Sequence, residues 1–271
     1  MGVFYEAIPT SMRQWILDQK VFWVATAPLS AAGHVNISPK GRQYFGVIDE
    51  RTFWYMDLSG SGNETISHLL EPNNGRITIQ FNAFEGPPRI LRLWGHGRVL
   101  ENGTDEYATF INSHEVHTLP GSRSIIVVDI HQVGSSCGFS VPFYDFKEFR
   151  PVLNDFFEKK RQKFEAGKLE ESMDRYWAYK NAWSMDGLPG MRRGLLAGKT
   201  EKVAPIKKMV GPLVPKRYQD GRGIAAEIVS LIAFLSFILG LTLAVYGPAL
   251  VELAQAVDVS RLRNTIARVS S

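Results

Sequence analysis

A short run of small polar residues, SGSGNE at positions 59–64, has the composition of an anion-binding loop. Gly60 and Gly62 free the backbone so that several N–H groups can point at one spot, and a helix after the loop would add the positive end of its dipole. Such a loop suits a phosphate. It is neither a Walker loop nor the dinucleotide fingerprint, because Thr65 stands where a third glycine is required. The alternative is a flexible turn that caps the following helix.

Two other segments place basic side chains where a phosphate could be held. Lys40 lies in ISPKG, at the expected end of a strand, and Arg89 and Arg92 interrupt the apolar alternation of RILRLW. Arginine offers planar, bidentate donors to phosphate, and lysine offers a point charge. A solvent-exposed lysine and a surface salt bridge are the alternatives. Together with the loop, these segments predict that the protein binds an anionic ligand, but they do not identify that ligand.

The remaining reactive residue types predict no metal site and no protein nucleophile. Cys137 is the single cysteine, so an internal disulfide is excluded, and a buried thiol at an interface is its expected role. His114 and His117 have a spacing that could suit a metal, but without a further His or Cys cluster they indicate a surface loop. No general acid or base stands out, so catalytic residues stay unassigned. That absence is typical of chemistry supplied by a cofactor.

The elements that must position these residues are mostly strands. Apolar and alternating runs predict strands at 21–28, 31–41, 45–49, 52–58, 76–84, 89–101 and 124–133, and helices at 9–19, 64–72, 104–114 and 145–180. Ser61 or Asn63 is the expected N-cap of the second helix. At least six strands with short connections predict a small, closed, mostly antiparallel barrel. A doubly wound parallel sheet would need a helix after nearly every strand.

Near its C-terminal end the chain carries an uncharged apolar run. Residues Ile228 to Val251 read IVSLIAFLSFILGLTLAVYGPALV, which is longer than the roughly 20 residues that cross a bilayer as a helix. The run predicts a single transmembrane helix, with a buried core helix as the alternative. Basic residues are slightly more numerous before the run than after it, and no secretory signal opens the chain. Both observations favour a single-pass membrane protein whose soluble domain faces the cytosol.

Composition agrees with one sizeable domain plus an anchor. The chain has 271 residues, of which 45% are hydrophobic, and a net charge of +4. Basic residues gather before the apolar run, in KTEKVAPIKK and VPKRYQDGR. Their position suggests contact with anionic lipid head groups and not with nucleic acid. No zinc-finger spacing, RNA-recognition signature or internal repeat is present in the sequence.

Five motifs carry a resemblance to a known family. They are HVNISPKG, FWYMDLSGSGNETISHL, GRITIQFNAFEGPPRILRLWGHGRV, SSCGFSVPFYDF and KNAWSMDGLPGM, in this order between residues 4 and 191. With them the chain resembles the pyridoxamine 5′-phosphate oxidase-like family of flavin mononucleotide (FMN)-binding split barrels, in an uncharacterised fungal branch. The resemblance implies a mainly β fold, a six-stranded antiparallel split β-barrel with flanking helices. It also implies a homodimer that holds a flavin in each of two clefts between subunits.

The resemblance further implies where the flavin would bind. A basic residue at the end of an early strand holds its phosphate, a loop after the next hairpin assists, and the strand entering that loop lies along the ring. Carried onto this chain, the cofactor-binding residues are Ser38, Lys40, Tyr55, Met56, Asp57, Ser59, Gly60, Ser61, Gly62, Asn63, Arg89 and Arg92. Vitamin B6 phosphate oxidases carry Arg-Lys where Ser61-Gly62 stand, and their C-terminal Arg-Leu-His segment has no counterpart in KNAWSMDGLPGM. Vitamin B6 oxidation is therefore not expected.

The expected protein is an FMN-dependent oxidoreductase that acts on a small molecule while tethered to a membrane. The alternative is a flavin- or haem-binding sensor or scaffold without turnover. The expected domains are a split barrel at 1–191, a basic linker at 192–223, a transmembrane anchor at 224–251 and a tail at 252–271.

Overall fold

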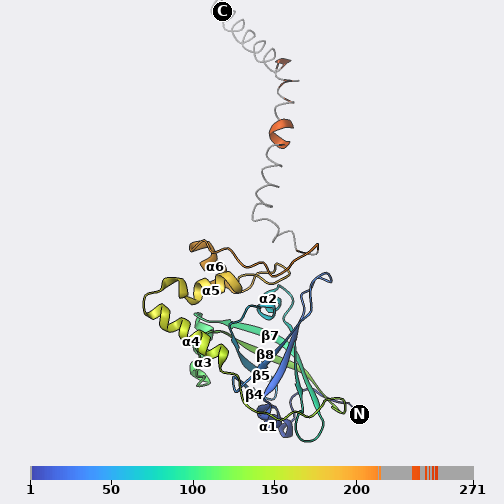
Figure 1. Ribbon diagram of the computed structural model, residues 1–271. Helices are drawn as coiled ribbons and strands as arrows, with labels where there is room; N and C mark the ends of the chain where they lie inside the picture. The colour runs from blue at the N-terminus through green and yellow to red at the C-terminus, as the bar shows by residue number, and fades with distance from the viewer. Residues whose placement is uncertain are drawn as a thin grey trace, which may run out of the picture. The chain divides into compact units, whose positions relative to one another are not determined.

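The computed structural model describes residues 2–212, 214, 234–238, 242, 244, 246 and 248–249. The chain divides into two compact units, residues 1–213 and residues 214–271. The first contains every named strand and helix (Figure 1). Within the described residues, no helix is both long enough and apolar enough to cross a bilayer. Most of the expected transmembrane segment, 228–251, lies outside those residues, so the segment stays a prediction.

One antiparallel sheet forms the body of the first unit. Its strands are β1 (Val3–Tyr5), β2 (Val21–Thr26), β3 (Asn36–Gly41), β4 (Phe45–Asp49), β5 (Thr52–Leu58), β6 (Arg76–Asn82), β7 (Ile90–Glu101) and β8 (Ser122–Ser136). They pair in the order β3-β2-β6-β7-β8-β5-β4, and β1 pairs with β8. The expected strands are confirmed, except that the strand expected at 31–41 begins only at Asn36, because residues 31–35 are in a turn and loop. The short β1 was missed because three residues are too few to show an alternation.

The sheet is an open half-barrel. Its path ends on β3 and β4, which follow one another in the chain and each pair with a single described strand. The expectation of a closed barrel was therefore wrong, whereas the mainly antiparallel split barrel that the resemblance implied is confirmed. The described sheet has eight strands, where the resemblance implied six. Figure 1 shows the sheet curving around its interior, with α1 (Thr10–Asp18) at one end. The physical reason is that the two strands at the ends of the path pair with different neighbours, β3 with β2 and β4 with β5, and no backbone ladder joins them to each other.

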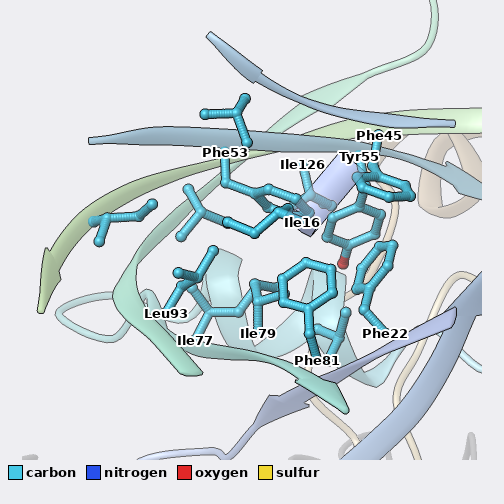
Figure 2. Close-up of a cluster of buried hydrophobic side chains, with 14 of the residues drawn as sticks. Ile16, Phe22, Phe45, Phe53, Tyr55, Ile77, Ile79, Phe81, Leu93 and Ile126 are labelled. Carbon is cyan, nitrogen blue, oxygen red and sulfur yellow. The ribbon is translucent and has the colours of Figure 1, made fainter. Parts of the chain in front are cut away.

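Aromatic side chains fill the inside of the half-barrel (Figure 2). The ring of Phe22 lies 5.0–5.6 Å, centroid to centroid, from four other rings, those of Phe45, Phe53, Tyr55 and Phe81. Each such aromatic pair adds about 0.5–1.5 kcal/mol beyond the burial of its surface. Helix α1 contributes Met12 and Ile16 to the same core. This packing holds the inward-facing residues of β2 and β5 in fixed positions.

The outer face of β5 is covered as well. Met56 packs there in a second cluster with Ile125, Val127 and Tyr107, the last from α3 (Asp105–Ser113). Because side chains alternate along a strand, Met56 points away from the face that carries Tyr55 and Asp57. Burial on both faces explains why β5 has an almost continuous apolar sequence.

Three helical elements follow the sheet. The helical segment expected at 145–180 consists of α4 (Val152–Glu165), the short 3-10 helix Leu169–Glu171 and α5 (Met173–Lys180). Residues 145–151 are not helical.

A further helix, α6 (Arg192–Thr200), lies in the segment expected to be a linker. Its first N–H groups, at Arg192 and Arg193, donate to the Glu101 carboxylate at 2.9 and 2.7 Å. Gly194 allows a close approach, since a Cβ there would lie 2.8 Å from the carbonyl oxygen of Trp177. The composition of the segment gave no sign of these tertiary contacts, so the linker expectation was wrong for residues 192–200.

Candidate anion-binding site

The loop 59–63 joins β5 to α2 (Glu64–Leu70). Asn63, one of the two residues expected at the N-cap of this helix, occupies that position. Its side chain, however, accepts no hydrogen bond from the first turn of the helix. Its Nδ2 instead donates to Ser67 Oγ at 3.0 Å. Neither Gly60 nor Gly62 has a left-handed backbone, so the loop does not depend on glycine conformations. The candidate site is therefore defined by the side chains that surround the loop.

Residues from the C-terminal part of the domain cover this loop. Trp177 Nε1 of α5 donates to Ser59 Oγ at 2.8 Å, and Asn181 Nδ2 donates to the Gly60 carbonyl at 2.8 Å. Ser59 is fully buried, whereas Ser61 is exposed. The loop is thus held from outside by α5 and the segment after it, and Ser61 is its accessible point.

Asp57 is the centre of a buried charge cluster. Its Oδ1 lies 2.9 Å from Lys40 Nζ on β3, and its Oδ2 lies 2.7 Å from Arg123 Nε on β8. The Asp57 side chain is fully buried. Burial by itself would raise the pKa of Asp57, but the charges and hydrogen bonds of Arg123 and Lys40 outweigh it and lower the pKa to about 2. The structure therefore brings Lys40 and Asp57 together, two residues that the sequence placed in one site.

Arg123 links this cluster to the loop. Its NH1 donates to the Gly62 carbonyl at 2.6 Å, and its side chain is 4% exposed. Sequence reasoning missed Arg123, because the strand was expected to begin only at residue 124. The only sign of Arg123 in the sequence was its position as a charged residue directly before a long apolar strand. Because charged residues at strand ends are usually solvated, this position did not indicate a buried site.

Lys208 reaches the loop from much farther along the chain. Its Nζ donates to Asn63 Oδ1 and lies 3.7 Å from Glu64 Oε1, and its side chain is 10% exposed. Burial, with a smaller effect from the charges of Arg123 and Lys180, lowers the pKa of Lys208 to about 8, although Glu64 opposes the shift. The sequence assigned this lysine to a lipid-facing linker. In the structure it is part of the candidate site.

Two hydroxyl groups near Lys40 lack partners. Lys40 Nζ lies 5.8 Å from the centre of the Tyr55 ring. The buried Tyr55 hydroxyl and Ser38 Oγ form no hydrogen bond with any described residue. Burial raises the pKa of Tyr55 well above its usual value, and the charge of Asp57 adds to the rise. Buried polar groups without partners are uncommon in folded proteins, so these hydroxyls are candidates for contact with a ligand.

Arg89 and Arg92 lie outside this cluster. Arg92 Nε donates to Gln80 Oε1 at 2.9 Å, and the Arg89 guanidinium lies 5.2 Å from the centre of the Trp15 ring. Arg92 alternates with the core residues Leu91 and Leu93, so its side chain is on the other face of the sheet. The structure thus separates both arginines, and Met56, from Lys40 and Asp57.

His34 and Asp186 form a further contact that sequence reasoning missed. His34 Nδ1 lies 2.6 Å from Asp186 Oδ1, and the His34 N–H donates to Asp186 Oδ2 at 2.8 Å. These residues are 152 positions apart, so no local pattern could join them. Cys137, expected to be buried, is exposed. No group of three or more His, Cys, Asp or Glu residues suited to a metal occurs in the described part of the chain.

The Asp57 cluster predicts a specific dependence of stability on pH. Because its pKa falls from 3.8 to about 2 on folding, Asp57 stabilises the folded state above pH 3.8, and this contribution disappears as the pH falls through about 2. We expect the loss to be about 2 kcal/mol. Urea unfolding at a series of pH values measures it, with Asp57→Asn as the comparison. The same acid-induced loss in both proteins would contradict the assignment.

Comparison with known proteins places the chain in a family. Residues 8–137 match the family described as pyridoxamine 5′-phosphate oxidase. The pyridoxamine 5′-phosphate oxidase family protein ustO of Aspergillus flavus is 37% identical over 209 residues, which cover 72% of this chain and 80% of that protein. Among solved structures, HupZ of Group A Streptococcus has a TM-score of 0.35 at 20% identity, covering 46% of this chain and 92% of HupZ. The FAD-binding protein of Mycobacterium smegmatis has a TM-score of 0.33 at 14% identity, covering 49% of this chain and 97% of that protein. The chain belongs to the pyridoxamine 5′-phosphate oxidase family.

Proposed function

We propose that this protein binds FMN and acts as a flavin-dependent oxidoreductase on a small molecule. One observation carries the proposal: three buried or half-buried cations from distant parts of the chain lie at an uncharged loop or at Asp57, two residues before it. They are Lys40, Arg123 and Lys208. Two carboxylates, Asp57 and Glu64, lie among them. The remaining positive charge suits a phosphate.

The donor set fits the phosphate of a flavin nucleotide. Lys208 and Arg123 would hold the phosphate beside the loop, and Lys40 would add to the positive field. The unpartnered hydroxyls of Ser38 and Tyr55 are free to hydrogen-bond a ligand. A bound flavin would supply the hydride or electron transfer, and the protein would bind it, orient it and limit its contact with water.

The proposal extends to assembly and location. The resemblance to split barrels supports a homodimer in which both subunits contribute to each flavin site. The apolar run at 228–251 supports a single-pass tether, and the distribution of basic residues favours a domain that faces the cytosol. Analytical ultracentrifugation of the detergent-solubilised chain tests the dimer, and protease accessibility in sealed vesicles tests the orientation.

The full-length chain, purified in detergent, tests the function itself. We expect a yellow protein with the absorbance spectrum of an oxidised flavin, bleached by NADPH or NADH and reoxidised by an electron acceptor. A bound flavin that neither nicotinamide donor reduces would favour a non-enzymatic sensor or scaffold. The absorbance spectrum of a bound haem would show that haem, and not FMN, is the cofactor. A colourless protein that binds no added FMN would overturn the proposal.

A further inference from the structure

The loop 59–63 cannot neutralise a phosphate with its own residues. It reads SGSGN, which contains no charged side chain. A phosphate monoester carries about −1.5 to −2 charge at neutral pH, so binding in a partly buried site requires cations. The cations must therefore come from elsewhere in the chain.

Two basic side chains approach the loop at adjacent residues. Arg123 binds the carbonyl of Gly62, from which it is separated by 61 positions, and Lys208 binds the side chain of Asn63, 145 positions away. Both side chains are at most about one-tenth exposed. Two buried cations therefore converge on neighbouring loop residues, and the described carboxylates that offset their charge are Asp57 and Glu64.

The two cations differ in how far they are already neutralised. Arg123 is paired directly with Asp57 at 2.7 Å. Lys208 has a neutral amide as its close partner, and its nearest described carboxylate, Glu64, lies at 3.7 Å. Lys208 therefore retains more unneutralised positive charge than Arg123. The lowered pKa of Lys208 agrees with this imbalance, since an added phosphate would raise it again.

The segment that carries Lys208 is held against the domain by its backbone. The Val203 N–H donates to the Gly198 carbonyl at 3.1 Å, and the Ile206 N–H donates to the Tyr179 carbonyl at 2.8 Å. These bonds anchor residues 203–209, which we call the Lys208 strap, to α5 and α6. The neighbouring Lys207 is exposed, so the strap directs one of two adjacent lysines into the site.

We propose that the Lys208 strap closes over the 59–63 loop and that Lys208 binds the phosphate of the flavin nucleotide. This inference rests on the proposed function and names the side chain of the C-terminal part of the domain that would hold the cofactor.

Titration of the full-length protein with FMN and with riboflavin, which lacks the phosphate, tests the inference. Lys208→Met should weaken FMN binding about 10- to 100-fold, the range expected for loss of one charge-assisted contact, and leave riboflavin binding unchanged. Lys207→Met is the matched control and should change neither affinity. Lys208→Arg retains the charge and should recover most of the FMN affinity.

The outcomes separate the inference from the function on which it rests. If Lys208→Met bound FMN as tightly as the wild-type protein, with the same ratio of FMN affinity to riboflavin affinity, Lys208 would have no role in binding the phosphate. The proposal that the protein binds a flavin would still stand. An equal loss of FMN affinity in Lys207→Met would show that the effect depends only on net charge, and it would also overturn the role of Lys208. A wild-type protein that binds neither flavin would overturn both. Urea unfolding of each variant shows whether it is folded, and Lys208→Arg provides the test if Lys208→Met is not.

Discussion

Replacement of Arg123 by methionine is expected to destabilise the domain by about 3–5 kcal/mol, the cost of removing one partner from a buried ion pair. The fully buried Asp57 carboxylate would keep only Lys40, whose side chain is 21% exposed. The Gly62 carbonyl would also lose its 2.6 Å hydrogen bond. A shift of the urea unfolding midpoint with an unchanged slope would measure the effect.

Two comparisons isolate the buried pair. Arg98→Met removes an exposed arginine that pairs with Asp129, where both side chains are more than half exposed, and should cost less than about 1 kcal/mol. Asp57→Asn in the Arg123→Met background removes the charge that was left behind and should restore part of the stability. A similar small cost for Arg123→Met and Arg98→Met would show that the Asp57 cluster does not stabilise the fold.

Replacement of Gly190 by alanine is expected to lower stability by about 1–3 kcal/mol and to weaken flavin binding with it. A Cβ at this position would collide with the side-chain amide of Asn63 and with the backbone carbonyl of Asn181. The backbone cannot move cheaply, because the Gly190 N–H donates to the Ala182 carbonyl at 2.8 Å. Since Asn63 binds Lys208 and Asn181 binds the loop, the collision would disturb both sides of the site. Urea unfolding and FMN titration measure the two effects.

Gly60→Ala is the matched control for the glycine substitution. Its added Cβ would meet no atom within 4 Å, and its backbone is not left-handed, so stability should change by less than about 0.5 kcal/mol. If alanine at position 190 were tolerated as well as alanine at position 60, the described packing of residues 181–191 over the loop would be wrong.

The sequence predicted the strands well because their evidence is local. Alternation along 76–84 and 89–101 requires only neighbouring residues, and the structure confirms both strands as β6 and β7. Lys40 and Asp57 were also identified within motifs. Their 2.9 Å contact follows from the inward faces of β3 and β5, a property of the whole sheet.

The missed parts of the site depend on distant contacts. Arg123 and Lys208 reach the loop across 61 and 145 positions, so their local sequences indicate a strand boundary and a basic linker. The same limitation produced the error at α6, whose start is fixed by Glu101 on β7. Residues whose role is set by long-range electrostatics have no periodic signal to detect.

The open edge at β3 has a consequence for aggregation. A strand with a neighbour on one side only can accept another chain's strand and begin an aggregate, and β3 exposes Ile37 along that edge. Pro39, at the centre of β3, has no N–H to donate, so an added strand would lose a hydrogen bond at that residue. The proline therefore disfavours growth of the sheet from chain to chain at this edge.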